Sequence, residues 1–335
     1  MSAARAVRIA VPGLADSIAR LAEEGGGLRA PAAEWLLARG RPATVAPPDW
    51  RDWLLAGGGL GADVLLRFPA GPASVPAELA GHGAATWSRA EPVHLLTAID
   101  HLRLAAPVPL PLDPAESDAL LGTLNAHLAG SGFELHAHPD GGWLCRCPDG
   151  LQCETVDPLQ ALGRNLREVL PGGRDAVRLR ALVNELQMLL HEHPVNERRA
   201  AHGLPPVNSV WLWGIGAVRD PAPGVAGELL TDDAWLAGLW RRHGGSVQPA
   251  TALATALARG GTQLRVATRA AVDGQAAADT LRALEAGLFV PLRAALAASR
   301  VDRVSLHTGR SVFDLTWTAR WAFWRRPRPL AEVPA

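Results

Sequence analysis

The sequence predicts a mixed α/β protein, in which a largely parallel sheet carries helices on both faces and a small α+β subdomain is inserted. Short apolar segments alternate with longer amphipathic segments along the chain, as in strand–helix–strand units. The first, Val7–Val11, is rich in β-branched residues and ends at Pro12-Gly13, so we expect a buried strand there. The clearest helix is Asp175–His191, where leucines recur at helical spacing before Pro194.

Turn and capping residues place the remaining elements. Asp113, Pro114 and Glu116 form the pattern of a capping box, so a helix should begin there and continue to about residue 130. Further helices are expected at 31–39, 49–55, 232–243, 249–259 and 276–298. Strands are expected at 63–68, 92–96, 133–137, 142–147, 208–213, 263–268, 302–307 and 311–316. A helix followed by a hairpin indicates an inserted subdomain at 112–159, which leaves 1–111 and 160–335 as the core.

Composition excludes several classes of protein. The 335 residues have a net charge of zero, so no global positive field exists to hold nucleic acid or an anionic membrane. Every cation is Arg, which rules out a Schiff-base lysine and a P-loop lysine. Residues 1–17 contain no apolar run long enough for a signal peptide and no run reaches transmembrane length, so we expect neither a leader nor a membrane span. Three closely spaced cysteines do not suggest a disulfide framework, so a cytoplasmic location is expected.

The cysteines and histidines give weak indications of metal binding. Cys145 and Cys147 alternate on one predicted strand, and together with Cys153 they could bind zinc with a nearby His, such as His136 or His138. Packing as small apolar residues is favoured for them. The run His191-Glu192-His193 lacks the spacing of H-E-x-x-H, and a role at the helix C-terminus is favoured for His191.

The tryptophan-rich C-terminal segment has two interpretations. Trp317, Trp321 and Trp324 are separated by four and three residues, so they form one stripe on a helix. A packed C-terminal helix is favoured over a segment that docks a protein partner or lies on a membrane surface. The following Arg325-Arg326-Pro327-Arg328 cluster is too short to indicate nucleic-acid binding.

Four polar residues between the main helix and the next strand are candidates for binding a small phosphorylated or otherwise anionic ligand. They are Asn196, Arg198, Arg199 and Asn208. An Arg fork matches the oxygens of a phosphate or carboxylate. An equally weighted alternative is that these side chains only fix the loop that precedes the strand at 208–213.

These residues also carry a family resemblance. The segment His193–Gly214 (HPVNERRAAHGLPPVNSVWLWG) resembles the HPxN–R–G–P–N–W–WG segment of archaeal-type cofactor-independent phosphoglycerate mutases. The run Trp87–His94 (WSRAEPVH) and the Trp-rich tail are similar to a divergent bacterial branch, the RpfE-type regulatory proteins. The resemblance implies an alkaline-phosphatase-like fold. It also implies a catalytic centre with two divalent cations, Mn²⁺ or Zn²⁺, around a Ser or Thr nucleophile.

The sequence departs from that family at the metal ligands. Pro12-Gly13 stands where the family has Asp-Gly, the nucleophile loop at 71–74 lacks its Asp, and His307 has no Asp before it. We therefore expect a metal-free relative with no catalytic residues, acting as a regulatory or binding protein. The alternative is an active mutase or related phosphoryl-transfer enzyme. It requires side chains to converge at the strand ends from among Asp16, Asp157, Asp220, Asp232, Asp233, Asp273 and His307.

Overall fold

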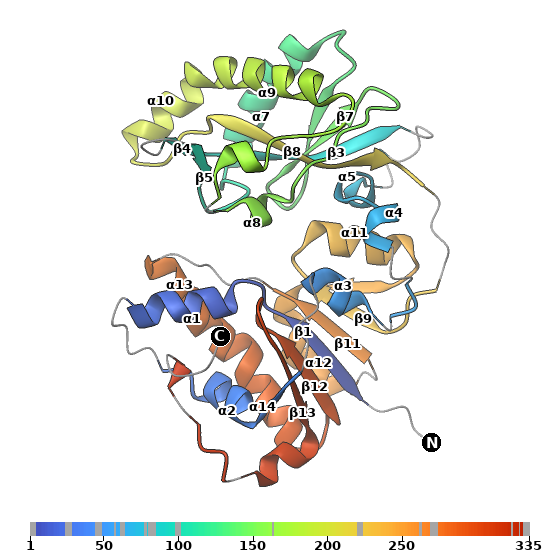
Figure 1. The fold of residues 1–335 in the computed structure, drawn as a ribbon, viewed down its shortest axis with the longest axis vertical. Coiled ribbons are helices and arrows are strands. Elements are labelled where there is room, and N and C mark those ends of the chain that lie inside the picture. Colours follow the sequence, from blue (N-terminus) through green and yellow to red (C-terminus); the bar gives the residue numbers. More distant parts are fainter. Residues whose placement is uncertain are drawn as a thin grey trace. The chain divides into compact units, whose positions relative to one another are not determined.

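The chain folds into two compact units, the first formed by residues 1–62 and 222–335 and the second by residues 63–221. Figure 1 labels the main helices and strands of both units. The computed structural model describes residues 5–23, 29–43, 49–56, 58–60, 64–76, 79, 85–97, 102–162, 164–219, 224–260, 263–268, 274–322, 324–327 and 329–330.

The first unit is built on a seven-stranded sheet with the strand order β10-β9-β11-β1-β12-β13-β2. The strands from β10 to β12 run parallel, and β13 and β2 pair antiparallel at one edge. Their bounds are β1 Ala6–Ala10, β2 Arg41–Pro42, β9 Glu228–Thr231, β10 Ser246–Gln248, β11 Gln263–Ala267, β12 Arg303–His307 and β13 Val312–Thr316. The predicted mixed, largely parallel sheet is confirmed.

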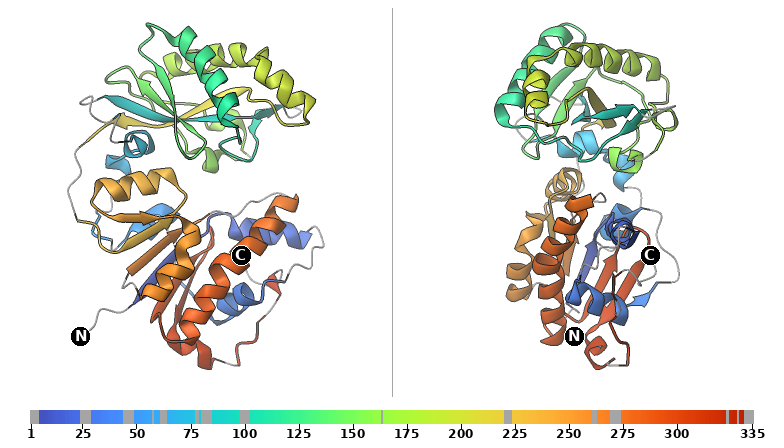
Figure 2. Two further views of the ribbon diagram at one scale, coloured as in Figure 1. Left: turned by 180° about the vertical axis from the view of Figure 1, so that it is seen from behind. Right: turned by 90° about the vertical axis from the view of Figure 1, so that its left-hand side faces the viewer.

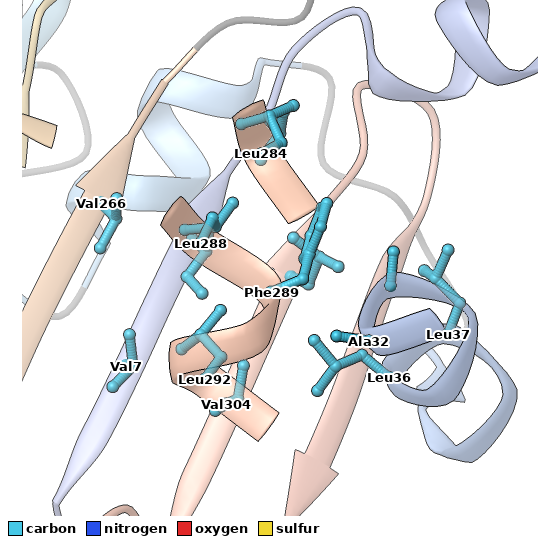
Figure 3. Packing of buried hydrophobic residues seen from close by; sticks show 14 of the residues in the cluster. Val7, Ala32, Leu36, Leu37, Val266, Leu284, Leu288, Phe289, Leu292 and Val304 are labelled. Carbon is cyan, nitrogen blue, oxygen red and sulfur yellow. The ribbon is translucent and has the colours of Figure 1, made fainter. Parts of the chain in front are cut away.

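Helices cover both faces of this sheet (Figure 2). The first set is α1 Leu14–Glu23, α2 Pro31–Arg39, α12 Leu253–Arg259, α13 Gly274–Leu284 and α14 Val290–Ala297, the last two joined by a π-helical turn, Glu285–Phe289. These helices share one core with Val7 of β1 and Val304 of β12. Figure 3 shows Phe289 and Leu292 packed in this core. On the other face lie α3 Trp50–Leu55 and α11 Ala234–Arg242. There Trp53 contacts Arg8 of β1.

The second unit contains a four-stranded antiparallel sheet in the order β6-β7-β3-β8. Its strands are β3 Thr86–Val93, β6 Glu134–Ala137, β7 Trp143–Cys147 and β8 Ser209–Ala217, beside a separate hairpin of β4 Leu95–Thr97 and β5 Leu102–Leu104. Its helices are α4 Val64–Arg67, α5 Ala70–Ser74, α7 Pro114–Leu128, α8 Pro158–Ala161, α9 Ala176–His191 and α10 Pro194–Ala201. Leucines of α7 and α9 form one core with the sheet.

The second unit is larger than the insert expected at 112–159. The helix and the hairpin of that insert are present as α7, β6 and β7, and the capping box of Asp113 and Glu116 is formed. However, β7 pairs with β3, and β3 also pairs with β8. The hairpin therefore completes a sheet whose other strands lie outside 112–159, and the boundaries of the unit move to 63 and 221.

Two predicted elements differ from the structure. The strand expected at 63–68 is the short helix α4, Val64–Arg67, and Asp63 lies outside the described residues. The packed C-terminal helix is also wrong, because Trp317–Trp321 forms a short 3₁₀ helix. Trp321 and Trp324 are 62% and 69% exposed, and Arg320 stacks between Trp317 and Trp321, so this segment has no apolar stripe to bury. Within the described residues, no helix is long and apolar enough to cross a membrane.

Candidate functional site

The carboxyl ends of β1 and β12 form the expected site of the first unit. In open α/β sheets, ligands bind outside the carboxyl ends of the parallel strands, where successive connections leave to opposite sides. Here β1 lies between β11 and β12, and its last residue, Ala10, lies beside Ala267 and His307. The residues that follow these strand ends therefore decide which chemistry the sheet supports.

His307, the last residue of β12, is a buried neutral side chain. Its ring lies 5.3 Å from the ring of Trp53 and is 1% exposed. Nδ1 accepts a hydrogen bond from the Gly309 N–H at 3.0 Å, so in the neutral ring Nε2 carries the proton. Nε2 is buried and has no hydrogen-bond partner in the described structure. Burial lowers the pKa of His307, and the nearby charge of Asp49 opposes this only in part. His307 thus presents an N–H donor rather than a lone pair for a cation.

The turn after β1 supplies backbone instead of a carboxylate. Gly13 has a φ of 84° and Gly309 a φ of 102°, conformations that favour glycine. A Cβ on Gly309 would lie 3.1 Å from the Gly13 nitrogen, so these two turns pack backbone against backbone. The Ser17 hydroxyl donates to the Gly13 carbonyl at 2.8 Å. Pro12, which precedes this turn, has no ligand atom in its side chain.

The nearby aspartates have other partners. Asp16 forms an ion pair with Arg310 at the surface. Asp232 accepts a hydrogen bond from the Ala250 N–H at 3.3 Å. Neither carboxylate joins His307 in a cluster, because within the described residues no group of three or more His, Cys, Asp or Glu side chains is placed to hold a metal ion.

Asp233 is committed to a buried ion pair and a helix cap. Its carboxylate lies 3.0 Å from the Arg51 guanidinium, with side chains only 5% and 1% exposed. It also accepts from the Leu236 N–H at the start of α11. Asp157 belongs to the second unit, where it caps α8 through the Leu159 N–H. Asp220 and Asp273 lie outside the described residues. The donor set that the structure describes does not fit a centre of two divalent cations.

The four candidate anion-binding residues lie in the second unit, around α10. His193 caps this helix, since its Nδ1 accepts from the Val195 N–H at 3.2 Å, and its Nε2 lies 2.9 Å from the Thr123 hydroxyl. Burial and the charge of Arg198 lower the pKa of His193. The His-Pro pair of the recognised motif therefore begins a helix, because Pro194 occupies its first position.

Two of these candidates are asparagines that connect separate segments of backbone. The Asn196 amide nitrogen donates to the carbonyls of Leu190 and Val207 at 2.7 and 2.8 Å, and its oxygen accepts from the Val207 N–H at 2.8 Å. Asn208 exchanges two hydrogen bonds with the backbone of Leu95, at 2.7 and 2.9 Å. Asn196 joins the end of α9 to the start of β8, and Asn208 joins β8 to β4.

The two arginines differ sharply in environment. Arg199 is 2% exposed; its guanidinium donates to the carbonyls of Pro205 and Pro111 and lies 2.7 Å from the Glu116 carboxylate. Arg198 is exposed, and its guanidinium makes no hydrogen bond to the residues that the structure describes. The hydrogen bonds therefore indicate a structural role in fixing the loop for three of the four candidates, Asn196, Arg199 and Asn208. Arg198 differs from them, because its guanidinium is exposed and makes no hydrogen bond to the described residues.

A buried charged cluster in the second unit was not expected from the sequence. Arg89 and Glu91 alternate on β3, each 3% exposed, with nitrogen–oxygen distances of 2.9 and 3.2 Å. Asp140 completes the cluster at 2.7 Å from Arg89 and 2.7 Å from His138. Burial alone would raise the pKa of Asp140, but the His138 hydrogen bond and the Arg89 charge lower it to about 2. The signal was present in the run Trp87–His94, which places two opposite charges on one face of a strand.

The cysteines belong to the packing of the same sheet. Cys145 and Cys147 are free and buried on β7, and both belong to the core formed with α7 and α9. A hydrogen bond with the Cys147 side chain, followed by burial, raises the pKa of the Cys145 thiol well above its usual value. Cys153 is half-buried, and His136, a possible zinc partner, stacks against Trp87 instead. The expected role of the cysteine pair in packing agrees with this placement.

Comparisons connect the chain to the mutases through part of its sequence. It is 30% identical over 130 residues to the 2,3-bisphosphoglycerate-independent phosphoglycerate mutase of Methanosarcina barkeri, covering 38% of this chain and 33% of that protein. It is 44% identical over 66 residues to the corresponding mutase of Methanothrix thermoacetophila, covering 20% of this chain and 16% of that protein. The matched segments thus span about a third or less of these relatives. No family profile matches the chain.

A solved structure supports the fold across nearly the whole chain. The PH0037 protein from Pyrococcus horikoshii aligns with 94% of this chain and 88% of its own, with a TM-score of 0.50 and 15% identity. At that identity the likeness concerns the fold alone. The alkaline-phosphatase-like α/β fold implied by the resemblance is confirmed, and the homologues are archaeal-type cofactor-independent phosphoglycerate mutases.

Proposed function

We propose that this protein is a metal-free, cytoplasmic relative of the phosphoglycerate mutases that acts as a regulatory or binding protein, of the RpfE type. The similarity to mutases supplies the ancestry. The observation that carries the proposal is the chemistry at the carboxyl ends of β1 and β12. There Pro12 offers no ligand atom where the resemblance implies a carboxylate, and His307 Nδ1 accepts a hydrogen bond from the Gly309 N–H.

The enzymatic alternative is an active phosphoglycerate mutase, or a related phosphoryl-transfer enzyme, with two Mn²⁺ or Zn²⁺ ions. Its support is that the similar proteins are named as mutases. Such a centre would activate a hydroxyl nucleophile and clamp the phosphoryl group. The region 71–74, where the resemblance implies a nucleophile loop, lies within the helix α5, and the Ser74 hydroxyl is buried without a hydrogen-bond partner in the described structure. It is not presented to a substrate.

Metal analysis combined with a mutase assay separates these functions. The purified protein would be incubated with Mn²⁺ or Zn²⁺, desalted, analysed for bound metal and assayed for interconversion of 2- and 3-phosphoglycerate. A mutase from Methanosarcina barkeri, treated in the same way, is the positive control. We expect substoichiometric metal and no turnover above the protein-free rate. Stoichiometric metal together with turnover would refute the proposal in favour of the enzyme.

Two surfaces are proposed for binding. Arg198 is the residue of the α10 loop that we propose for a phosphorylated or other anionic ligand, since its guanidinium is free of hydrogen bonds to the described residues. A protein partner is proposed for the exposed indoles of Trp317, Trp321 and Trp324. If Arg198 binds an anion, phosphate should raise the thermal midpoint of the wild type but not of Arg198→Gln. Equal shifts in both proteins would exclude Arg198.

A further inference from the structure

The second unit contains an apolar cavity of about 240 Å³ that none of the sites above uses. It lies along β8, an edge strand of the four-stranded sheet, and is lined also by α9, the β4–β5 hairpin and residues 155–171. Its apolar lining comprises Leu95, Leu102, Val156, Leu166, Val169, Leu170, Pro171, Val183, Val210, Trp211 and Leu212. The Trp211 Nε1–H donates to the Val156 carbonyl at 2.9 Å, which fixes the indole as one wall.

The polar lining comes mainly from one face of α9. Arg180, Asn184 and Gln187 are spaced by four and three residues, so they project in the same direction from the helix. The Gln187 amide nitrogen donates to the Ser209 hydroxyl at 2.9 Å. The Arg180 guanidinium and the Asn184 amide make no hydrogen bond within the described residues.

The charge of the cavity has one sign. Among the described residues that line it there is no Asp or Glu, and Arg180 is the one charged residue of that set. A ligand in this cavity would contact apolar side chains and, on one face of α9, the Arg180 guanidinium and the Asn184 amide, whose N–H donors make no hydrogen bond within the described residues. A guanidinium fork matches the two oxygens of a carboxylate, and Asn adds a further donor.

We propose that this cavity binds a small amphipathic carboxylate, with an aryl or medium-chain alkyl body among the leucines and a carboxylate on Arg180 and Asn184. The volume is sufficient, because an apolar cavity of about 150 Å³ accommodates benzene. Leu102 and Leu170, 39% and 43% exposed, are apolar residues that such a body would cover. The proposal does not depend on whether the protein is a mutase, because the cavity is lined by residues of the second unit, whereas β1 and β12 belong to the first.

Titration calorimetry with 3-phenylpropionate and octanoate tests this directly, with 3-phenylpropionamide and octanamide as neutral counterparts. We expect saturable binding of the acids and about two- to fivefold weaker binding of the amides, since Arg180 and Asn184 are exposed and a solvent-exposed ion pair adds a modest amount to affinity. Arg180→Gln should reduce affinity for the acids to that for the amides. Arg178→Gln, which removes the same charge from α9 outside the cavity, should leave the preference for acids intact.

A second variant tests the apolar part of the site. Val183→Phe adds bulk to the half-buried lining of the cavity while Arg180 remains in place. It should abolish binding of acids and amides alike, with circular dichroism and thermal unfolding confirming that the variant is folded. The proposal is overturned if neither acid binds saturably at millimolar concentration, or if amides bind as tightly as acids. It is also overturned if Arg178→Gln loses as much affinity as Arg180→Gln, or if folded Val183→Phe binds as the wild type does.

Discussion

Replacing Asn196 with alanine should destabilise the second unit strongly, and the reason lies in three hydrogen bonds. The side chain donates to the carbonyls of Leu190 and Val207 and accepts from the Val207 N–H, all in a buried environment. Alanine removes all three hydrogen bonds. The Val207 N–H then has no side-chain acceptor, and the carbonyls of Leu190 and Val207 each lose one hydrogen bond. The cavity left by the amide is too small to admit several waters that would replace them.

The magnitude follows from the cost of unsatisfied buried groups. An orphaned buried donor or acceptor costs about 1–3 kcal/mol, with the donor the more severe case. In Asn196→Ala the Val207 N–H loses its hydrogen bond to the Asn196 side chain, and the carbonyls of Leu190 and Val207 lose one hydrogen bond each. Since these effects are not additive and local relaxation recovers part of the loss, we expect Asn196→Ala to cost about 3–5 kcal/mol. Arg198→Ala, two residues away and exposed, should change stability by less than about 0.5 kcal/mol.

Thermal unfolding and amide hydrogen exchange provide the assay. The thermal midpoint should fall clearly for Asn196→Ala, and peptides that contain Val207 should lose protection from exchange, because its N–H would no longer be bonded to a side chain. Peptides from the seven-stranded sheet are the internal control. A loss below about 1 kcal/mol in phosphate-free buffer would refute the structural role. A midpoint difference that appears only when phosphate is added would favour anion binding by Asn196 instead.

Further predictions concern buried charges and pH. Arg51→Met should cost about 3–5 kcal/mol in urea unfolding, because it leaves the Asp233 carboxylate buried without its cation, and a cost near zero would contradict the ion pair. The pKa of Asp140 is depressed to about 2 in the folded protein, so above pH 5 this carboxylate should contribute about 2 kcal/mol to the free energy of unfolding, and the contribution is lost as the pH falls through the folded pKa. The difference in free energy of unfolding between wild type and Asp140→Asn should therefore shrink towards pH 2. A difference that stays constant with pH would exclude the charged cluster as its source. His307 has a folded pKa below its unfolded value, so the unfolded state binds more protons and stability should fall as the pH decreases below about 7. In His307→Phe the thermal midpoint should vary less between pH 8 and 5, and an unchanged slope would show that His307 is not buried as a neutral ring.

Much of the fold could be predicted because its signals are local. The capping box at Asp113 and the leucine spacing of α9 depend only on neighbours in the sequence, and both are present in the structure. The prediction of a strand at 63–68 is wrong because Val64, Leu65 and Leu66 form an apolar run of only three residues before Arg67, too short for a strand period to be distinguished from a helical one. The conformation of Val64–Arg67 depends on contacts with residues distant in the sequence, and no local sequence pattern shows those contacts.

In the candidate site, too, the features that depend on neighbouring residues could be predicted and those that depend on distant residues could not. The spacing of the His193–Gly214 segment indicated ancestry, but hydrogen bonds between distant residues decide what its polar groups do. Asn196 reaches Val207, Asn208 reaches Leu95, and Arg199 reaches Glu116, separated by 83 residues. No local pattern contains these partners. The same holds for the cavity beside α9, whose lining comes from segments between Leu95 and Leu212.

The position of β1 has a consequence for how the chain folds during synthesis. Its partner strands, β11 and β12, lie more than two hundred residues later, while the second unit is continuous from 63 to 221. When the ribosome has completed residue 221, the second unit has all of its strands, and β1 still has none of its neighbours. We therefore expect the middle of the chain to fold first, with an apolar N-terminal strand unpaired until the last third of the chain emerges. During that interval the side chains of Val7 and Ile9, which are buried in the folded protein, have no sheet to pack in.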